Sequence, residues 1–411
     1  MAAASPAPIK KVLVPIAAGT EPVEASVPID ILRRAGADVT VAAAGGVDGL
    51  LVEVMYGVKV VADCADASYD LVALPGGVPG AANLGGCAAL ESIVRRHALC
   101  RICSKFHIHD KGRASAEAQR RPVAGGFTRE AHQELAPMLT RKGATAHPAF
   151  VDKFPAEVTA VDANVVVDGK VVTANGPATA MEFALALVEQ LYGKDKADQI
   201  AKPMLVRYEP GYTFKELNPI RWHCIGTPKV LIPLANASED MEVMVIVDAL
   251  RRANADVVVA SAEDGLEIVA RHNMRIVADV LLDAAADDQQ FDLIIVPGGM
   301  PGAKTLAGKE KLVALLKKQA EANKPYGAIG AATAQVLEPH GLLKQGKKAT
   351  TCTSMVGLLA DAGECENRVV VDGNLITSRS PGTAMEFAVA VVEKLLGREA
   401  AREVAEGLLF V

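Results

Sequence analysis

The chain has 411 residues, of which 50% are hydrophobic and 22% charged, a composition typical of a globular protein with two or three domains. This balance excludes a disordered, collagen-like or disulfide-rich chain, and no apolar run reaches the roughly 18 residues that a membrane-spanning helix needs. The net charge is −6, with 43 Lys and Arg interspersed among 49 Asp and Glu, so no basic stripe indicates nucleic-acid binding.

Along the first half of the chain, short apolar runs bounded by turn residues alternate with longer patterns of helical period. The predicted strands are Val12–Ala17, Val39–Ala44 and Leu71–Leu74, and the predicted helices are Glu24–Arg34, Leu90–His97 and Ala180–Tyr192. This alternation predicts an α/β sandwich with a largely parallel sheet. In such folds the chemistry lies where strand ends meet helix starts.

The same motifs recur in the second half of the chain. The matching pairs are Lys11–Ala17 with Lys229–Ala235, Asp30–Asp38 with Asp248–Asp256, Tyr69–Gly77 with Phe291–Gly299, and Thr179–Ala184 with Thr383–Ala388. The repeat predicts two tandem homologous domains, over residues 10–205 and 228–411. Residues 206–227 between them contain the only tryptophan, Trp222, and show neither a helical nor a strand period. We expect this linker to pack across a domain seam.

Acidic residues follow the first predicted strand of each repeat. Glu21 and Glu239 are placed to stabilise a helix dipole from the first turn. Glu24 and Glu242 are expected deeper, at the sheet edge, where a desolvated carboxyl group with a raised pKa can donate a hydrogen bond or move a proton. A catalytic role for this second pair competes with a structural one.

A Pro-Gly-Gly turn follows a predicted buried strand in each repeat, giving the pairs Gly76 with Gly77 and Gly298 with Gly299. Paired glycines let backbone N–H groups approach a bound oxygen, as in an oxyanion hole. The alternative is a tight turn that needs glycine for a positive φ.

Together with the tail Thr377–Ala388, these motifs resemble the DJ-1/PfpI family of the class I glutamine amidotransferase-like superfamily, over nearly the whole chain. The resemblance implies two tandem flavodoxin-like α/β sandwich domains, as in the plant members. It implies stress protection, chaperone-like activity, and glyoxalase III, deglycase or D-lactate dehydratase chemistry on a small reactive aldehyde such as methylglyoxal. It also implies that Glu24 and Glu242 lie beside a reactive cysteine and that the glycine pairs form its oxyanion side. We expect no cofactor and no metal.

The family's nucleophile is a cysteine on a strand-to-helix elbow, and neither repeat keeps it. In the second repeat the matching position is Gly330, and glycine offers no nucleophile. The family histidine that follows is replaced there by Cys352, whose thiol need not take over the missing role. The first repeat keeps this histidine as His147, but no elbow motif precedes it. Catalytic competence is therefore in question in both repeats.

Residues 98–141 depart most from the family pattern and include 17 extra residues relative to the second repeat. Four side chains there superficially offer zinc ligands: Cys100, Cys103, His107 and His109. Their spacing is too short for the usual finger, and such a site would replace a core strand of the sheet. We favour the interpretation that altered splicing or reading frame produced the segment and disrupted the centre of the first domain. The sequence of the transcript tests this.

Seven cysteines, an odd number, without a recognisable signal peptide predict reduced thiols and a cytoplasmic location, with the nucleus as a second compartment. We expect no nucleic-acid or membrane partner, and either an intramolecular pseudo-dimer of the two repeats or a homo-oligomer. Two functions stay open: an enzyme of the glyoxalase III type, and a non-enzymatic scaffold, chaperone-like or binding protein. A cysteine peptidase would need the absent thiol.

Overall fold

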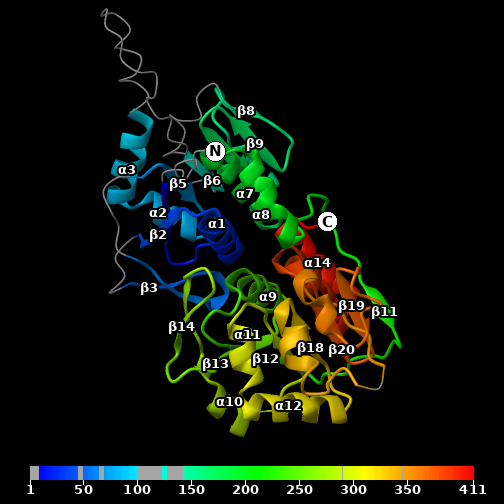
Figure 1. Cartoon of the computed structure of the whole chain (residues 1–411). Coiled ribbons are helices and arrows are strands. Elements are labelled where there is room, and N and C mark those ends of the chain that lie inside the picture. Colours follow the sequence, from blue (N-terminus) through cyan, green and yellow to red (C-terminus); the bar gives the residue numbers. More distant parts are fainter. Residues whose placement is uncertain are drawn as a thin grey trace, which may run out of the picture. The chain divides into compact units, whose positions relative to one another are not determined.

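A computed structural model describes residues 9–44, 50–63, 69–99, 123–126, 142–288, 290–344 and 346–411. They fall into two compact units, unit 1 within Met1–Met55 and Ala62–Ile200 and unit 2 within Tyr56–Val61 and Ala201–Val411. Each unit is built on a β-sheet with helices against it, which confirms the α/β class (Figure 1). Among the residues described, no helix is long and apolar enough to cross a membrane.

Unit 1 contains a six-stranded sheet in the order β2-β1-β5-β6-β10-β9, parallel except for β9. Its strands are β1 (Lys11–Ile16), β2 (Asp38–Ala43), β5 (Leu71–Leu74), β6 (Val123–Gly126), β9 (Val165–Asp168) and β10 (Val171–Ala174). Its helices are α1 (Pro22–Arg34), α2 (Gly80–Gly85), α3 (Ala88–Leu99), α6 (Pro148–Val151) and α7 (Ala180–Tyr192). The short strands are β3 (Leu51–Glu53), β7 (Gly143–Ala144) and β8 (Thr159–Ala160), and α8 (Lys194–Met204) follows α7. The predicted strands and helices of the first repeat are confirmed, each to within two residues at either end.

The start of α1 shows how the sequence sets a helix boundary. Glu21 is the N-cap, and its carboxylate accepts a hydrogen bond of 2.6 Å from the Glu24 N–H, while Pro22 occupies the first turn, where a missing N–H costs nothing. Glu21 therefore stabilises the start of the helix, where the sequence places it, through a direct hydrogen bond. Because α1 packs against α7, its apolar residues complete the core on one side of the sheet.

Strand β6 is the described part of the centre of the atypical segment 98–141, whose origin by altered splicing or reading frame stays a prediction. Val123–Gly126 lies between β5 and β10 and pairs with both in parallel. A run of four residues with two glycines carries little strand signal in a sequence, but neighbours on both sides supply the hydrogen-bonding partners of its backbone. The zinc candidates Cys100, Cys103, His107 and His109 lie outside the described residues.

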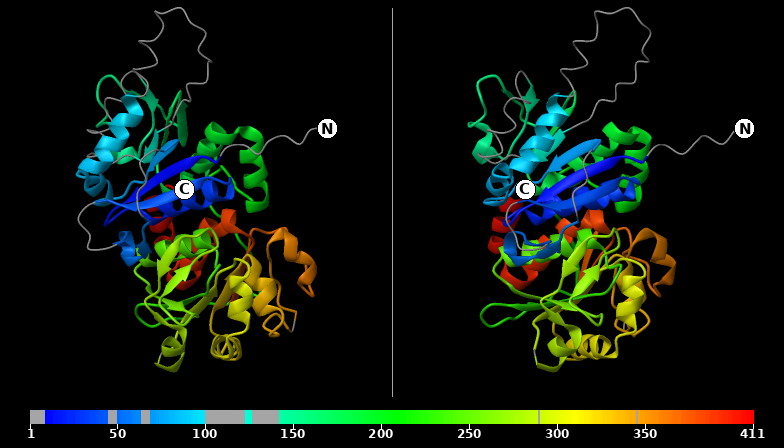
Figure 2. Two further views of the ribbon diagram at one scale, coloured as in Figure 1. Left: turned by 60° about the vertical axis from the view of Figure 1, so that its left-hand side comes forward. Right: turned by 90° about the vertical axis from the view of Figure 1, so that its left-hand side faces the viewer.

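Unit 2 contains an eight-stranded sheet in the order β11-β19-β20-β18-β17-β12-β13-β16. Its strands are β11 (Lys215–Leu217), β12 (Lys229–Leu234), β13 (Asp256–Ser261), β16 (Val280–Leu281), β17 (Leu293–Val296), β18 (Tyr326–Ile329), β19 (Val369–Asp372) and β20 (Leu375–Ser378). Its helices are α9 (Asp240–Arg252), α10 (Leu282–Asp288), α11 (Gly302–Ala307), α12 (Glu310–Glu321), α13 (Ala384–Leu396) and α14 (Arg398–Leu408). Helices α9 and α13 pack together on one face of this sheet, and α10, α11 and α12 cover the other (Figures 1 and 2).

A smaller antiparallel arrangement lies beside this sheet. Strands β14 (Glu267–Val269) and β15 (Arg275–Val277) form a hairpin, and β15 also pairs with β4 (Lys59–Val61). Unit 2 thus includes a strand from the first repeat of the sequence.

The linker is more ordered than its sequence indicates. Lys215–Leu217 forms β11, which extends the unit 2 sheet in parallel beside β19. The buried Trp222 side chain donates a hydrogen bond of 2.9 Å from Nε1 to the Gly373 carbonyl, and Tyr212 donates to the Glu393 carboxylate. Strand β11 could not be predicted from the sequence, because three residues are too few to show a period.

Candidate functional site

The carboxyl end of β18 in unit 2 forms the elbow at which the sequence places Gly330. Gly330 has φ +60°, and its N–H donates a 3.0 Å hydrogen bond to the Ser378 carbonyl at the end of β20. Its own carbonyl accepts a 2.8 Å hydrogen bond from Thr351 Oγ1. The left-handed backbone of a nucleophile elbow is therefore present and fixed on both sides, although the residue on it carries no side chain.

Glu242 of α9 faces this elbow. The residue is 1% exposed, and its Oε2 accepts a 2.7 Å hydrogen bond from the Gly298 N–H. Its Oε1 lies 2.7 Å from the point that a Cβ on Gly330 would occupy. A Cβ at position 330 would therefore overlap this carboxylate, and the Glu242 side chain would have to shift to accommodate it. The structure brings Glu242, Gly298 and Gly330 together.

Cys352 lies on the segment that follows Thr351. Its side chain is half-buried, and its Sγ is 3.6 Å from Ser354 Oγ at the start of the short 3-10 helix Thr353–Leu358. Cys352 thus directly follows the residue that binds the elbow carbonyl but does not occupy the elbow position.

Sequence reasoning missed one charged residue of this region, Arg379. It is 7% exposed and donates to Thr353 Oγ1 at 3.2 Å and to the Glu366 carbonyl at 3.3 Å. Because Arg379 directly follows the Ser378 carbonyl that binds Gly330, it adds a buried positive charge beside the site. Its place inside the tail motif Thr377–Ala388 was the signal that could have identified it.

The two glycines of each Pro-Gly-Gly turn play different parts. The N–H groups of Gly76 and Gly298 each donate to a glutamate carboxylate of the same unit at 2.7 Å. Gly77 and Gly299 have φ +102° and +92°, so the tight turn expected as the alternative is present. The first glycine of each pair thus binds a carboxylate of the protein, and the second allows the turn.

The corresponding site of unit 1 has the same carboxylate in different surroundings. Glu24 is half-buried and lines a small cavity with Leu74, Pro75, Ala174, Gly176, Ala180 and Phe183. Its free volume of about 10 Å³ is close to what one water molecule needs. Strand β6 ends at Gly126 in the register at which β18 ends at Ile329, so Phe127 is the match of Gly330; it lies outside the described residues.

His147 of unit 1 has a structural role. It is the N-cap of α6, and its Nδ1 accepts a 3.2 Å hydrogen bond from the Ala149 N–H. Burial lowers the pKa of the imidazole, which favours the neutral form that can accept this bond. The same ring packs edge-on against Phe150.

Comparisons with known proteins show which family this chain resembles. The DJ-1/PfpI family model matches residues 10–101, 134–190 and 228–394, and its gap falls inside the atypical segment 98–141. Protein DJ-1 homolog B of Arabidopsis thaliana is 48% identical over 407 residues, which cover 97% of this chain and 88% of that protein. Glutathione-independent glyoxalase DJR-1.2 of Caenorhabditis elegans is 35% identical, over 41% of this chain and 89% of that protein. The solved structure of oxidized Toxoplasma gondii DJ-1 is 39% identical and matches 45% of this chain and all of its own, with a TM-score of 0.44.

Proposed function

The chain belongs to the DJ-1/PfpI family, and on this premise we propose a DJ-1-like stress-protection protein whose second unit keeps a pocket for a small aldehyde without the thiol that turnover needs. One observation carries the proposal. At the elbow, Gly330 keeps the backbone geometry and the Glu242 contact of a reactive-cysteine site but supplies no sulfur. The name of the nematode glyoxalase supports methylglyoxal as the aldehyde to test.

The missing step is the first one of a glyoxalase III or deglycase reaction. A thiolate forms a carbon–sulfur bond with the aldehyde carbon, the carbonyl electron pair moves to oxygen, and a neighbouring group exchanges the proton. Glu242 is buried beside the elbow, where it could take that proton, but no sulfur atom is bonded to residue 330. Loss of a nucleophile commonly costs several orders of magnitude in rate.

A second function, a non-enzymatic scaffold or binding protein, is favoured by the state of both sites. Glu24 and Glu242 are each tied to a glycine N–H in the same way, and in each repeat the elbow position lacks a cysteine. Such pockets can bind a small polar group, a peptide segment or another subunit without chemistry. Cytosol and nucleus stay our predicted locations for either function, and imaging of the tagged full-length chain tests them.

The test compares methylglyoxal consumption and lactate formation by the purified full chain and by its Gly330→Cys variant. We expect the unaltered chain to match the buffer rate and the variant to exceed it by at least about 100-fold, since nucleophilic catalysis then becomes available. Gly330→Ala is the matched control, because it adds the same Cβ beside Glu242 without sulfur. Turnover by the unaltered chain that Cys352→Ser or Glu242→Gln abolishes would show that another group has replaced the cysteine, and the proposal would be wrong.

A further inference from the structure

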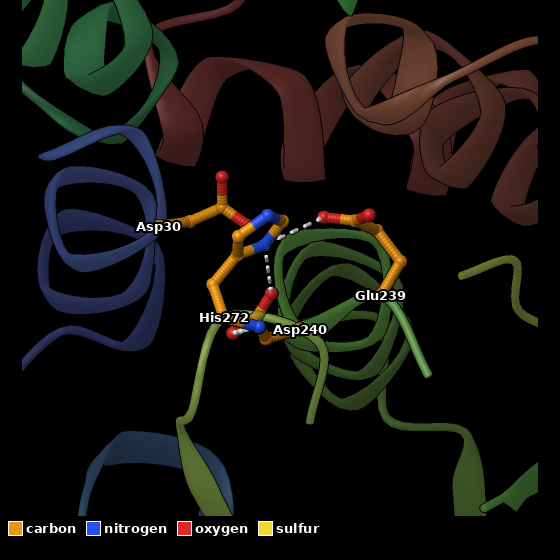
Figure 3. A group of neighbouring side chains, drawn as sticks. All are labelled: Asp30, Glu239, Asp240 and His272. Carbon is orange, nitrogen blue, oxygen red and sulfur yellow. Dashed lines mark hydrogen bonds and ion pairs between the residues drawn. The ribbon is translucent and has the colours of Figure 1, made fainter. Parts of the chain in front are cut away.

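A second polar cluster lies at the start of α9, where the tip of the β14–β15 hairpin meets the helix. Its members in unit 2 are Glu239, Asp240 and His272, whose side chains Figure 3 shows converging. Glu239 is 3% exposed and Asp240 is fully buried, while the imidazole of His272 is partly exposed. The cluster contains a histidine and two carboxylates, which are the ligand types of first-row transition metals.

The ligand atoms lie at distances that suit one metal ion. His272 Nδ1 is 3.3 Å from Asp240 Oδ1 and 3.7 Å from Glu239 Oε1, and the ligand atoms of the group all lie within 4.8 Å of one another. An ion bound at about 2.1 Å holds adjacent ligand atoms roughly 3.0 Å apart in an octahedron and roughly 3.4 Å apart in a tetrahedron. The two spacings from His272 Nδ1 differ from the tetrahedral edge by a few tenths of an ångström, within reach of side-chain rotation.

Two hydrogen bonds hold the hairpin tip against the helix. The Arg271 N–H donates a 2.9 Å hydrogen bond to the Ser238 carbonyl, and the His272 N–H donates a 3.3 Å hydrogen bond to Asp240 Oδ2. The imidazole is therefore presented to the two carboxylates by the fold itself. Such pre-organisation lowers the entropic cost of assembling a metal site.

We propose that Glu239, Asp240 and His272 bind one divalent first-row transition-metal ion, through the two carboxylates and His272 Nδ1. His272 Nδ1 binds the metal through the lone pair of the neutral imidazole, whose single proton is then on Nε2. Water completes the coordination. None of the three ligands is one of the elbow residues Glu242, Gly298 and Gly330, so the proposal does not depend on the proposed aldehyde chemistry.

The first repeat offers an internal contrast. Positions that match the three ligands there are Glu21, Pro22 and Tyr56, so one carboxylate remains and the second carboxylate and the imidazole are absent. Sequence analysis assigned Glu239 only to the helix dipole, because its neighbours in space come from a hairpin about 30 residues farther along the chain. We therefore expect one such site in each chain.

The test uses Mn²⁺, because this ion prefers oxygen and nitrogen ligands and the chain's cysteines compete poorly for it. The full chain, freed of metal with a chelator, is titrated with MnCl₂ while electron paramagnetic resonance follows the signal of free hydrated Mn²⁺. We expect saturable binding of one Mn²⁺ per chain. An unchanged free Mn²⁺ signal up to about 1 mM metal would overturn the proposal, since carboxylate–imidazole sites of this kind bind the ion well below that concentration.

Two pairs of variants assign the binding to this cluster. His272→Ala and the isosteric Asp240→Asn should each raise the Kd for Mn²⁺ at least tenfold, as expected on loss of a direct ligand. The matched controls His223→Ala and Asp287→Asn alter exposed residues elsewhere in unit 2 and should leave the Kd unchanged. Circular dichroism shows whether each variant is folded. If His272→Ala does not fold, Asp240→Asn alone tests the site. Equal binding by the altered ligands and the controls would overturn the proposal.

Discussion

In unit 1 the Glu24 carboxylate accepts a hydrogen bond from Gly76, and in unit 2 Glu242 accepts the same bond from Gly298, both at 2.7 Å. The residue expected to react beside them differs, because Gly330 occupies the elbow of unit 2 while the register of β6 assigns that place in unit 1 to Phe127. The glutamate–glycine contact therefore persists in two repeats that have both lost the cysteine. We infer that this contact belongs to the scaffold and needs no nucleophile to form.

The largest expected effect tests whether Glu242 has a role beyond the structural contact that it shares with Glu24. In a chain that carries Gly330→Cys, the further change Glu242→Gln should lower the methylglyoxal rate by about 10²- to 10⁴-fold, because it removes the group that exchanges the proton with the new thiol. The measurement is lactate formation at saturating substrate. Glu310→Gln, an exposed position at the start of α12, is the control and should leave the rate as it is. Equal rates with and without Glu242→Gln would show that this carboxylate has no catalytic role.

A second prediction tests whether the two Pro-Gly-Gly turns are equally constrained. A Cβ on Gly77 would lie 2.5 Å from the Glu21 nitrogen, and one on Gly299 would lie 2.5 Å from the Glu239 nitrogen. Gly77→Ala and Gly299→Ala should each lower the free energy of unfolding of their own unit by about 3 kcal/mol, from steric overlap and backbone strain together. Urea unfolding followed by Trp222 fluorescence reports on unit 2, and hydrogen exchange of β1 reports on unit 1.

The control for both turns is Gly36→Ala. Gly36 has φ +90° but nothing lies within 4 Å of its added Cβ, so only backbone strain of about 1 kcal/mol is expected. A loss at Gly77 or Gly299 no greater than at Gly36 would show that the turn backbone yields and that close packing does not require glycine there.

A third prediction concerns the Asp–Arg pair that both repeats place along their first long helix, Asp30 with Arg34 and Asp248 with Arg252. Burial raises the pKa of Asp248 to about 6, although Arg252 acts in the opposite direction. The folded state therefore binds more protons than the unfolded state between about pH 4 and pH 6. Stability from this group is fully present below about pH 4 and is lost as the pH rises through 6, on the order of 3 kcal/mol.

Asp248→Asn should remove this part of the pH dependence. The measurement is the urea midpoint of Trp222 fluorescence between pH 4 and pH 7 for the unaltered chain and the variant. Identical pH profiles would mean that the carboxylate is ionised in the fold across the whole range, contrary to the direction given by its burial.

The smallest expected effect comes from a substitution at Thr351, which removes a contact of the unit 2 elbow that the first repeat lacks. Thr351 holds the Gly330 carbonyl through a buried hydrogen bond, whereas the matching residue of the first repeat is Ala146. Thr351→Val keeps the shape and should cost about 1 kcal/mol in unfolding free energy, the usual net contribution of such a bond. In the Gly330→Cys background the same change should also lower turnover, because the elbow is less rigidly held. No change in either quantity would show that Ser378 alone fixes the elbow.

Much of the fold could be predicted because the strands are fully apolar and the motifs occur twice. Leu71–Leu74 and Ala180–Tyr192 match their predicted bounds, since each has a clear period and clear end signals. Strands β6 and β11 were missed because their formation depends on pairing with strands that are distant in sequence.

For the site, the sequence identified the residues but not all of their contacts. The family resemblance implied that Glu242 lies beside the elbow position, and in the structure Glu242 faces Gly330. The sequence did not reveal that the Gly298 N–H binds Glu242, nor that Arg379 is buried nearby, because both depend on how loops cross that edge. The sequence did not reveal the cluster of Glu239, Asp240 and His272 either, because it too depends on how the loops are placed.

Strand β4 has a consequence for how this chain can be divided. Residues 56–61 belong by sequence to the first repeat, yet they pair with β15 in unit 2. A gene fragment that starts at the linker would encode the second repeat without one of its strands, and the exposed edge of β15 would be open to pairing with other chains. A duplicated gene whose copies share a strand in this way is no longer two exchangeable modules, so recombination or fragmentation between the repeats would yield aggregation-prone products.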